Sequence, residues 1–145
     1  MGKPIILAAM TLFAGQFGSA MAGDPDIGRV FYADHCAACH GVELEGAPDW
    51  QRSGPDGLFP APPHDETGHT WHHGDGMLFD YVERGGQAVL DDLGVSFTSG
   101  MPGFGDILSA EEIDAILTFI RSTWPLGLSE GQIAHLDDAH ASMFL

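Results

Sequence analysis

Two cysteines and a histidine are the residues of this chain whose types and spacing indicate a definite chemistry. Cys36 and Cys39 are separated by two alanines, and His40 follows the second cysteine directly. The spacing Cys-x-x-Cys-His is the pattern at which haem is attached covalently. On a helical turn, the two thiols can add to the two vinyl groups at one edge of the macrocycle, and the adjacent imidazole can reach the iron. The motif therefore predicts one covalent haem, held by Cys36 and Cys39, with His40 as an axial ligand of its iron.

Three other interpretations of the cysteine pair are weaker. Cysteines of an exported protein often form a disulfide, but the close spacing and the histidine that follows argue against one here. A thioredoxin-like redox pair belongs in a βαβ context, which this sequence lacks. A zinc site needs a second pair of ligands at a suitable distance, and the chain has no other cysteine. Haem attachment is therefore the favoured interpretation.

The first 22 residues are predicted to be a signal peptide. Lys3 gives them a positive start, and the apolar run over residues 5–13 is too short to cross a bilayer as a helix, which needs about 20 apolar residues. The small residues Ala20 and Ala22 then form a signal-peptidase pattern. A buried core helix is the alternative. We expect cleavage after Ala22, a periplasmic product, and no transmembrane segment after leader removal. Export also favours haem attachment, because covalent haem is attached outside the cytoplasm.

The chain is strongly acidic, with 21 Asp and Glu residues against 5 Lys and Arg residues and a formal net charge of −16. Loss of Lys3 with the leader changes the charge from −16 to −17. Such a surface repels nucleic acid and attracts basic surfaces. We therefore expect redox partner proteins with basic docking surfaces and no nucleic acid partner. The alternative is that the acidity only keeps the protein soluble.

The segment before the motif must place the cysteines and the histidine. Residues 28–35 run directly into Cys36 without a proline. Gly28 and Tyr32 are four positions apart, so they share one face if the segment is a helix. A glycine on that face allows a second helix to approach closely. We therefore expect a helix before the motif that packs against another helix.

A second helix is predicted near residues 110–124. Ser109 and Glu112 form a capping box, in which each side chain binds the backbone of the other residue. Pro125 ends the segment because it has no amide hydrogen to donate. Between these signals, apolar side chains recur at helical spacing at Ile113, Ile116, Leu117, Ile120 and Trp124.

The motif and these two segments together resemble the class I cytochromes c. In that family, a glycine eight positions before the first cysteine and an aromatic residue four positions before it face the C-terminal helix. Gly28 and Tyr32 occupy these places, and Ile116 and Phe119 match the residues that the family packs against its N-terminal helix. The resemblance spans roughly residues 26–125. It implies an all-α, class I cytochrome c fold, with three to four helices around one covalently bound haem c.

The resemblance also implies the second axial ligand of the iron. Residues 99–104 contain Met101 followed by a proline and look like the distal loop of the family. A thioether suits iron, and Met/His ligation raises the reduction potential. Met77 falls in a short helix predicted over residues 75–82 and is interpreted as a core residue. Met101 is therefore the expected ligand, with His72, His73 or an open iron as alternatives.

The glycine- and proline-rich residues 46–76 resemble the loop that wraps around the haem in this family. Trp71 is a candidate to donate its indole N–H to a haem propionate, and packing in the core is its alternative role. The loop also contains four histidines whose density would suit a second site for copper or zinc. Solvated or propionate-bonded side chains are the favoured interpretation, and the metal site is the alternative, for these four, which are His64, His69, His72 and His73.

We expect three parts in the chain: a signal peptide at 1–22, a cytochrome c domain at 23–125 and a C-terminal extension at 126–145. The favoured function is a periplasmic carrier with one haem, ligated by His40 and Met101, that transfers single electrons between redox partners. A dedicated haem subunit of a periplasmic oxidoreductase is one alternative. A haem protein that binds copper or zinc through its histidine-rich loop is the other. Independent catalysis is not expected, since no nucleophile–base arrangement or acid pair stands out.

Overall fold

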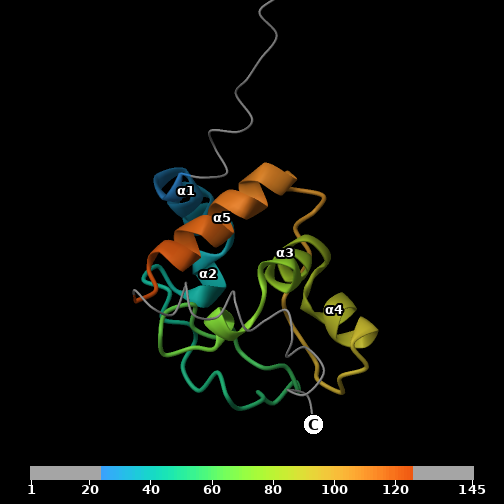
Figure 1. Cartoon of the computed structure of the whole chain (residues 1–145). Helices are drawn as coiled ribbons and strands as arrows, with labels where there is room; N and C mark the ends of the chain where they lie inside the picture. Colours follow the sequence, from blue (N-terminus) through green and yellow to red (C-terminus); the bar gives the residue numbers. More distant parts are fainter. Residues whose placement is uncertain (1–23, 126–145) are drawn as a thin grey trace, which may run out of the picture.

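Residues 24–125, which the computed structural model describes, form helices joined by long loops (Figure 1). Within this range no β-strand is present, and the only extended pairing is an isolated bridge between Phe59 and Ser99. The predicted all-α class is therefore confirmed. The predicted signal peptide and C-terminal extension lie outside the described residues. The α-helices are α1 (Pro25–His35), α2 (Ala37–His40), α3 (Asp75–Arg84), α4 (Gly86–Asp92) and α5 (Ala110–Ser122), and a 3-10 turn spans Thr70–His72.

The described range holds five α-helices, whereas three to four were expected. The helix α2 is a four-residue turn that continues α1 after Cys36, so it adds no separate layer. The helix α4 was not predicted. It begins directly after α3 because Gly85 adopts a φ of +86°, a conformation that glycine reaches at little cost, and this turn redirects the chain.

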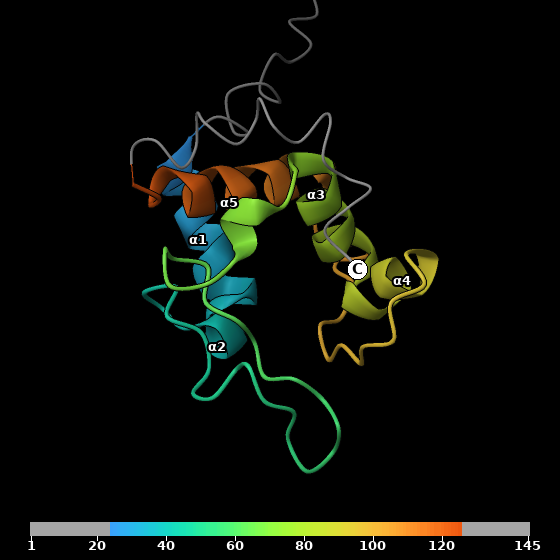
Figure 2. The same cartoon turned by 60° about the horizontal axis from the view of Figure 1, so that its bottom comes forward.

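The helices α1 and α5 cross at one end of the domain and form its most extensive helix–helix contact within the described residues (Figures 1 and 2). Asp24 caps α1 by accepting a hydrogen bond from the N–H of Asp26, and the predicted capping box of Ser109 and Glu112 begins α5. The buried face of α1 consists of Gly28 and Tyr32. The buried face of α5 supplies most of the core with Ile113, Ala115, Ile116, Leu117, Phe119 and Ile120.

The long loops are tied to this helix pair by specific contacts. The indole N–H of Trp124, just after α5, donates to the His64 carbonyl oxygen at 2.8 Å. This bond holds the loop between α2 and α3, which is called the middle loop below. Arg121 of α5 pairs with Asp75 at the start of α3, at 2.9 Å between charged atoms. In Figure 2, α3 and α4 lie on the opposite side of the domain from α1 and α2. In residues 24–125, no helix combines the length and hydropathy needed to span a bilayer.

Candidate functional site

The two cysteines lie at the junction of α1 and α2 and are free thiols. The N–H groups of Cys39 and His40 both donate to the Cys36 carbonyl oxygen, at 3.1 and 3.0 Å, which fixes the motif as one helical turn. Cys36 is partly buried against the core, whereas Cys39 is exposed. Burial, together with the nearby Cys39, raises the pKa of Cys36 to about 11. Because neither cysteine is in a disulfide, both thiols can form thioether bonds, and the raised pKa means that Cys36 is protonated before it reacts.

His40 is the residue of the motif with the most specific environment. Its side chain is buried, and Nδ1 lies 2.9 Å from the Pro62 carbonyl oxygen. A carbonyl can only accept, so Nδ1 carries the hydrogen and Nε2 presents a lone pair. Nε2 makes no hydrogen bond within the described residues. Burial lowers the pKa of His40 and keeps the ring neutral. A neutral imidazole with one nitrogen held by a carbonyl is how proteins orient a histidine toward a metal ion.

A tyrosine of α1 holds the backbone that follows His40. The Tyr32 hydroxyl donates to the Gly41 carbonyl oxygen at 2.8 Å, and its ring lies 5.4 Å from the ring of Phe119 on α5. Burial raises the pKa of Tyr32, so the hydroxyl stays protonated and remains a donor. The sequence indicated that Tyr32 faces α5. The structure adds that its hydroxyl anchors the end of the Cys-x-x-Cys-His turn.

Met101 lies in the segment between α4 and α5. Its side chain is partly buried and packs against the hydrophobic core, as Cys36 also does. The Met101 carbonyl oxygen accepts from the Gly86 N–H at 3.0 Å, and its own N–H donates to Ser99 Oγ at 3.2 Å. Both backbone polar groups of Met101 are therefore fixed. A thioether held on the core in this way is a suitable ligand for a metal ion that prefers soft donors.

Trp71 makes local contacts in the middle loop. Its indole N–H donates to the Gly68 carbonyl oxygen at 3.1 Å, and its ring stacks on His72 with centroids 3.6 Å apart. Its partly buried ring also packs against the core. The donor that was expected to reach a haem propionate therefore has a backbone acceptor in this structure, and the propionate contact stays a prediction.

The four histidines of the middle loop have different partners. His64 stacks on His40 with centroids 4.1 Å apart, and its Nδ1 lies 2.8 Å from Thr70 Oγ1. Burial, with the nearby His40 and His69, lowers the pKa of His64 to about 3. His69 stacks on Trp50 at 5.5 Å and meets His73 edge-on at 5.2 Å.

No group of three or more His, Cys, Asp or Glu side chains within residues 24–125 is arranged to hold a metal ion. The histidine-rich loop therefore offers no such group for a second copper or zinc site in the described part of the chain. His69 and His73 contact each other, but His64 lies against His40 and Thr70, and His72 stacks on Trp71.

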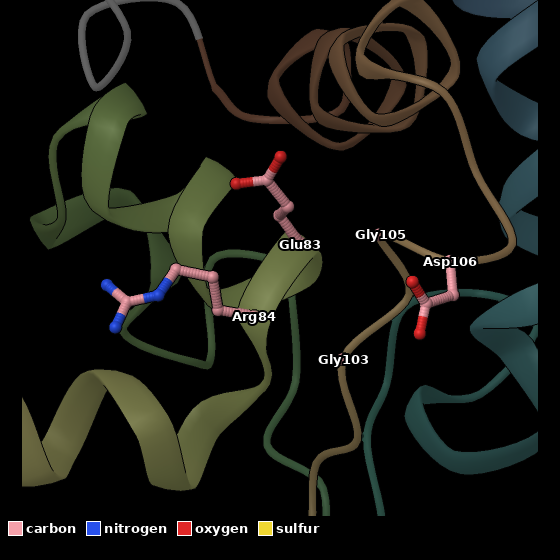
Figure 3. Close-up of a pocket in the computed structure, with 5 residues that line it drawn as sticks. All are labelled: Glu83, Arg84, Gly103, Gly105 and Asp106. Atoms are coloured by element: carbon pink, nitrogen blue, oxygen red, sulfur yellow. The ribbon is translucent and has the colours of Figure 1, made fainter.

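An open hollow lies outside the predicted site, next to the Met101 segment (Figure 3). The Arg84 side chain extends away from Asp106 in this view, and it pairs with Asp92 of α4. None of the predicted haem-binding residues contributes to the hollow, which is lined by Glu83, Arg84, Gly103, Gly105 and Asp106.

Sequence reasoning missed three groups that support the site: the Pro62 carbonyl oxygen, the Gln87 amide and the Ser99 hydroxyl. The Pro62 group belongs to the backbone, so no residue type signals it. Gln87 and Ser99 are 12 positions apart and meet only because α4 folds back on residues 99–104, which are called the distal segment below. No local pattern could have paired them.

One comparison with known proteins identifies a family for this chain. The family model described as Cytochrome c matches residues 26–124. No curated protein and no solved structure matches the chain significantly. The matched range runs from α1 to the end of the segment after α5 and includes both cysteines, His40 and Met101.

Proposed function

The chain belongs to the cytochrome c family, and from this premise we propose that it is an exported electron carrier with one haem, whose iron is bound by His40 and Met101. Membership in the family means that the chain carries covalent haem c and takes part in haem-based electron transfer. The proposal adds the two axial ligands, the export and the role as a carrier between proteins.

The hydrogen bond between His40 and Pro62 is the observation that carries this proposal. It fixes the tautomer in which Nδ1 bears the hydrogen, and it leaves the Nε2 lone pair for a metal ion. The two thiols precede this imidazole on the same helical turn. A pair of free thiols and an oriented neutral imidazole form the donor set that covalent haem requires.

Met101 is the proposed second ligand, and its surroundings support that role. The core keeps its side chain partly buried, and two hydrogen bonds fix its backbone. A thioether that is held in place needs little ordering on binding. The haem iron, when bound, supplies a one-electron couple. The chain supplies two ligands that exclude other molecules, which suits a carrier rather than an oxygen-binding protein or a peroxidase.

The axial-ligand proposal is tested by Met101→Leu, which keeps an apolar side chain of similar size but removes the sulfur. Oxidised wild-type protein should show the weak near-infrared band of sulfur-to-iron charge transfer. The variant should lose this band, and its reduction potential should fall. Met77→Leu on α3 is the matched control and should keep both properties. A band that survives in Met101→Leu would show that the sulfur ligand comes from another residue.

The role as a mobile carrier is supported by the charge of the domain. Two of the four arginines in residues 24–125 already pair with carboxylates: Arg84 with Asp80 and Asp92, and Arg121 with Asp75. Unpaired carboxylates therefore dominate the surface potential. Such a surface would guide a redox partner with a basic docking face toward the carrier.

A further inference from the structure

A side chain of α4 binds the backbone of the distal segment two residues before Met101. Gln87 Oε1 accepts a hydrogen bond from the Ser99 N–H at 3.0 Å. Gln87 Nε2 donates to Asp91 Oδ1, one turn later on α4, at 2.7 Å. The two partners fix the orientation of the Gln87 amide. The Ser99 N–H must face the amide oxygen, and the Asp91 carboxylate must face the amide nitrogen.

The contact continues from Ser99 to Met101. Ser99 Oγ accepts from the Met101 N–H at 3.2 Å, while the first residue of α4, Gly86, donates its N–H to the Met101 carbonyl oxygen at 3.0 Å. The start of α4 therefore binds the methionine backbone directly at one group and through Ser99 at the other. Gln87 is the side chain that holds Ser99 in place for this second contact.

The packing leaves no room for the distal segment to shift toward α4. A Cβ atom on Gly86 would lie 2.1 Å from Ser99 Oγ and 3.4 Å from Met101 Cβ. A Cβ atom on Gly85 would lie 2.7 Å from the backbone nitrogen of Gly103. Gly85 and Gly103 therefore meet backbone to backbone, and the Ser99 and Met101 side chains lie directly against Gly86.

We propose that Gln87 is a positioning residue for the Met101 thioether and acts through Ser99. This inference rests on the proposed ligation of the iron by Met101. A thioether is a neutral ligand, so its occupancy depends on how firmly the segment presents it. Loss of the Gln87 contact should raise the fraction of molecules in which the sixth position is open. The apparent dissociation constant of an external ligand is inversely proportional to that fraction, so it falls as the fraction rises.

The test measures imidazole binding to the oxidised holoprotein, with the near-infrared band and thermal unfolding as parallel readouts. Gln87→Leu keeps the size and the helix propensity but removes the acceptor for Ser99. It should bind imidazole about fivefold more tightly than the wild type, equivalent to ~1 kcal/mol, and should also lower the intensity of the band. Gln87→Glu combined with Asp91→Asn retains an acceptor oxygen for the Ser99 N–H without placing two carboxylates in contact, and this variant should keep the affinity within about twofold of the wild type.

Ser99→Ala provides a second route to the same contact, because it removes the acceptor of the Met101 N–H. It should also tighten imidazole binding, and the double variant with Gln87→Leu should bind little more tightly than either single variant, because both changes break one chain of contacts. A purely structural role for Gln87 would lower the melting temperature of Gln87→Leu and leave its imidazole affinity unchanged, which would overturn the proposal.

Met101→Leu separates failure of this inference from failure of the axial-ligand proposal. If Met101→Leu tightens imidazole binding and Gln87→Leu does not, Met101 is a ligand and the role of Gln87 is wrong. If neither variant changes imidazole binding and the wild type lacks the band, the axial-ligand proposal fails and the role of Gln87 fails with it.

Discussion

The backbone of Ala115 passes so close to Gly28 that a Cβ atom on residue 28 would lie 1.9 Å from the Ala115 carbonyl oxygen. The helices α1 and α5 therefore touch backbone to backbone at this point. The same approach brings Tyr32, one turn further along α1, against Phe119 and into hydrogen-bond distance of Gly41. The crossing of two helices thus determines where the Cys-x-x-Cys-His turn ends.

Gly28→Ala should destabilise the holoprotein, even though alanine favours helices. The added methyl group would force α1 away from α5, and such overpacking costs about 1–3 kcal/mol in the free energy of unfolding. Gly76→Ala on α3 is the matched control. Nothing lies within 4 Å of a Cβ atom at that position, so this change should be neutral or stabilising by up to about 1 kcal/mol. Denaturant unfolding of both variants provides the measurement, and equal stabilities would contradict the close crossing.

Replacing both cysteines should abolish covalent haem. Cys36→Ala combined with Cys39→Ala removes both thiols, so no thioether can form and little folded protein should accumulate. The single variant Cys39→Ala keeps the partly buried thiol and serves as the comparison. Haem-stained denaturing gels report the result directly. Stain that persists in the double variant would contradict attachment at these residues.

Export should leave a mature chain that begins at Gly23. The small residues before this position match a signal-peptidase site, and the apolar run that precedes them is too short for an anchor. A mass spectrum of the periplasmic fraction measures the terminus. A membrane-bound product that retains Met1 would show that the apolar run is an anchor.

Burial of neutral His64 should make the protein sensitive to acid. Its pKa is lowered to about 3, below the usual value of 6.5, so the unfolded chain binds more protons between these values. Above about pH 6.5, His64 is neutral in both the folded and the unfolded state and does not affect stability. As pH falls from 6.5 toward 3, the free energy of unfolding decreases by at most ~1.4 kcal/mol per pH unit.

The variant His64→Asn replaces the imidazole with an amide that can still form a hydrogen bond to Thr70 but does not titrate. Its unfolding free energy should therefore decrease less steeply than that of the wild type between pH 6 and pH 4. Denaturant unfolding of both holoproteins across this interval tests the expectation. Parallel curves would mean that His64 does not carry the acid sensitivity.

Association with the redox partner should slow as salt rises. A chain with a formal net charge of −16 attracts a basic surface over about one Debye length, ~8 Å at physiological ionic strength. Steering acts mainly on the association rate. Stopped-flow electron transfer across a salt series measures this dependence. A flat curve would point to docking through an apolar patch, and a rate that rises with salt would point to an acidic partner.

The fold class and the haem motif could be predicted from the sequence because their signals are local. The Cys-x-x-Cys-His spacing lies within one helical turn, and the capping box joins Ser109 to a residue three positions away. The same holds for the start of α3 at Asp75. Interactions between near neighbours depend on residue type and spacing, and both can be read directly from the sequence.

The histidine-rich loop shows what such reading leaves open. Four histidines within ten residues left a second metal site as an alternative to solvated or propionate-bonded side chains, since ligands close in sequence are often close in space. The structure places His64 on the ring of His40 and His69 on Trp50. Spacing within an irregular loop does not determine the direction of a side chain, because no helical or strand period relates one residue to the next.

The sequence by itself determined the spacing of the Cys-x-x-Cys-His motif and which segments become the two main helices. Only the tertiary structure decided the tautomer of His40, the acceptor of the Tyr32 hydroxyl and the hydrogen bonds that hold the backbone around Met101. These depend on the Pro62 carbonyl 22 positions away, on the Gly41 carbonyl, and on the meeting of Gln87 with Ser99. Every residue carries the same carbonyl and nearly every residue the same N–H, so only the path of the folded chain selects which of them becomes a partner.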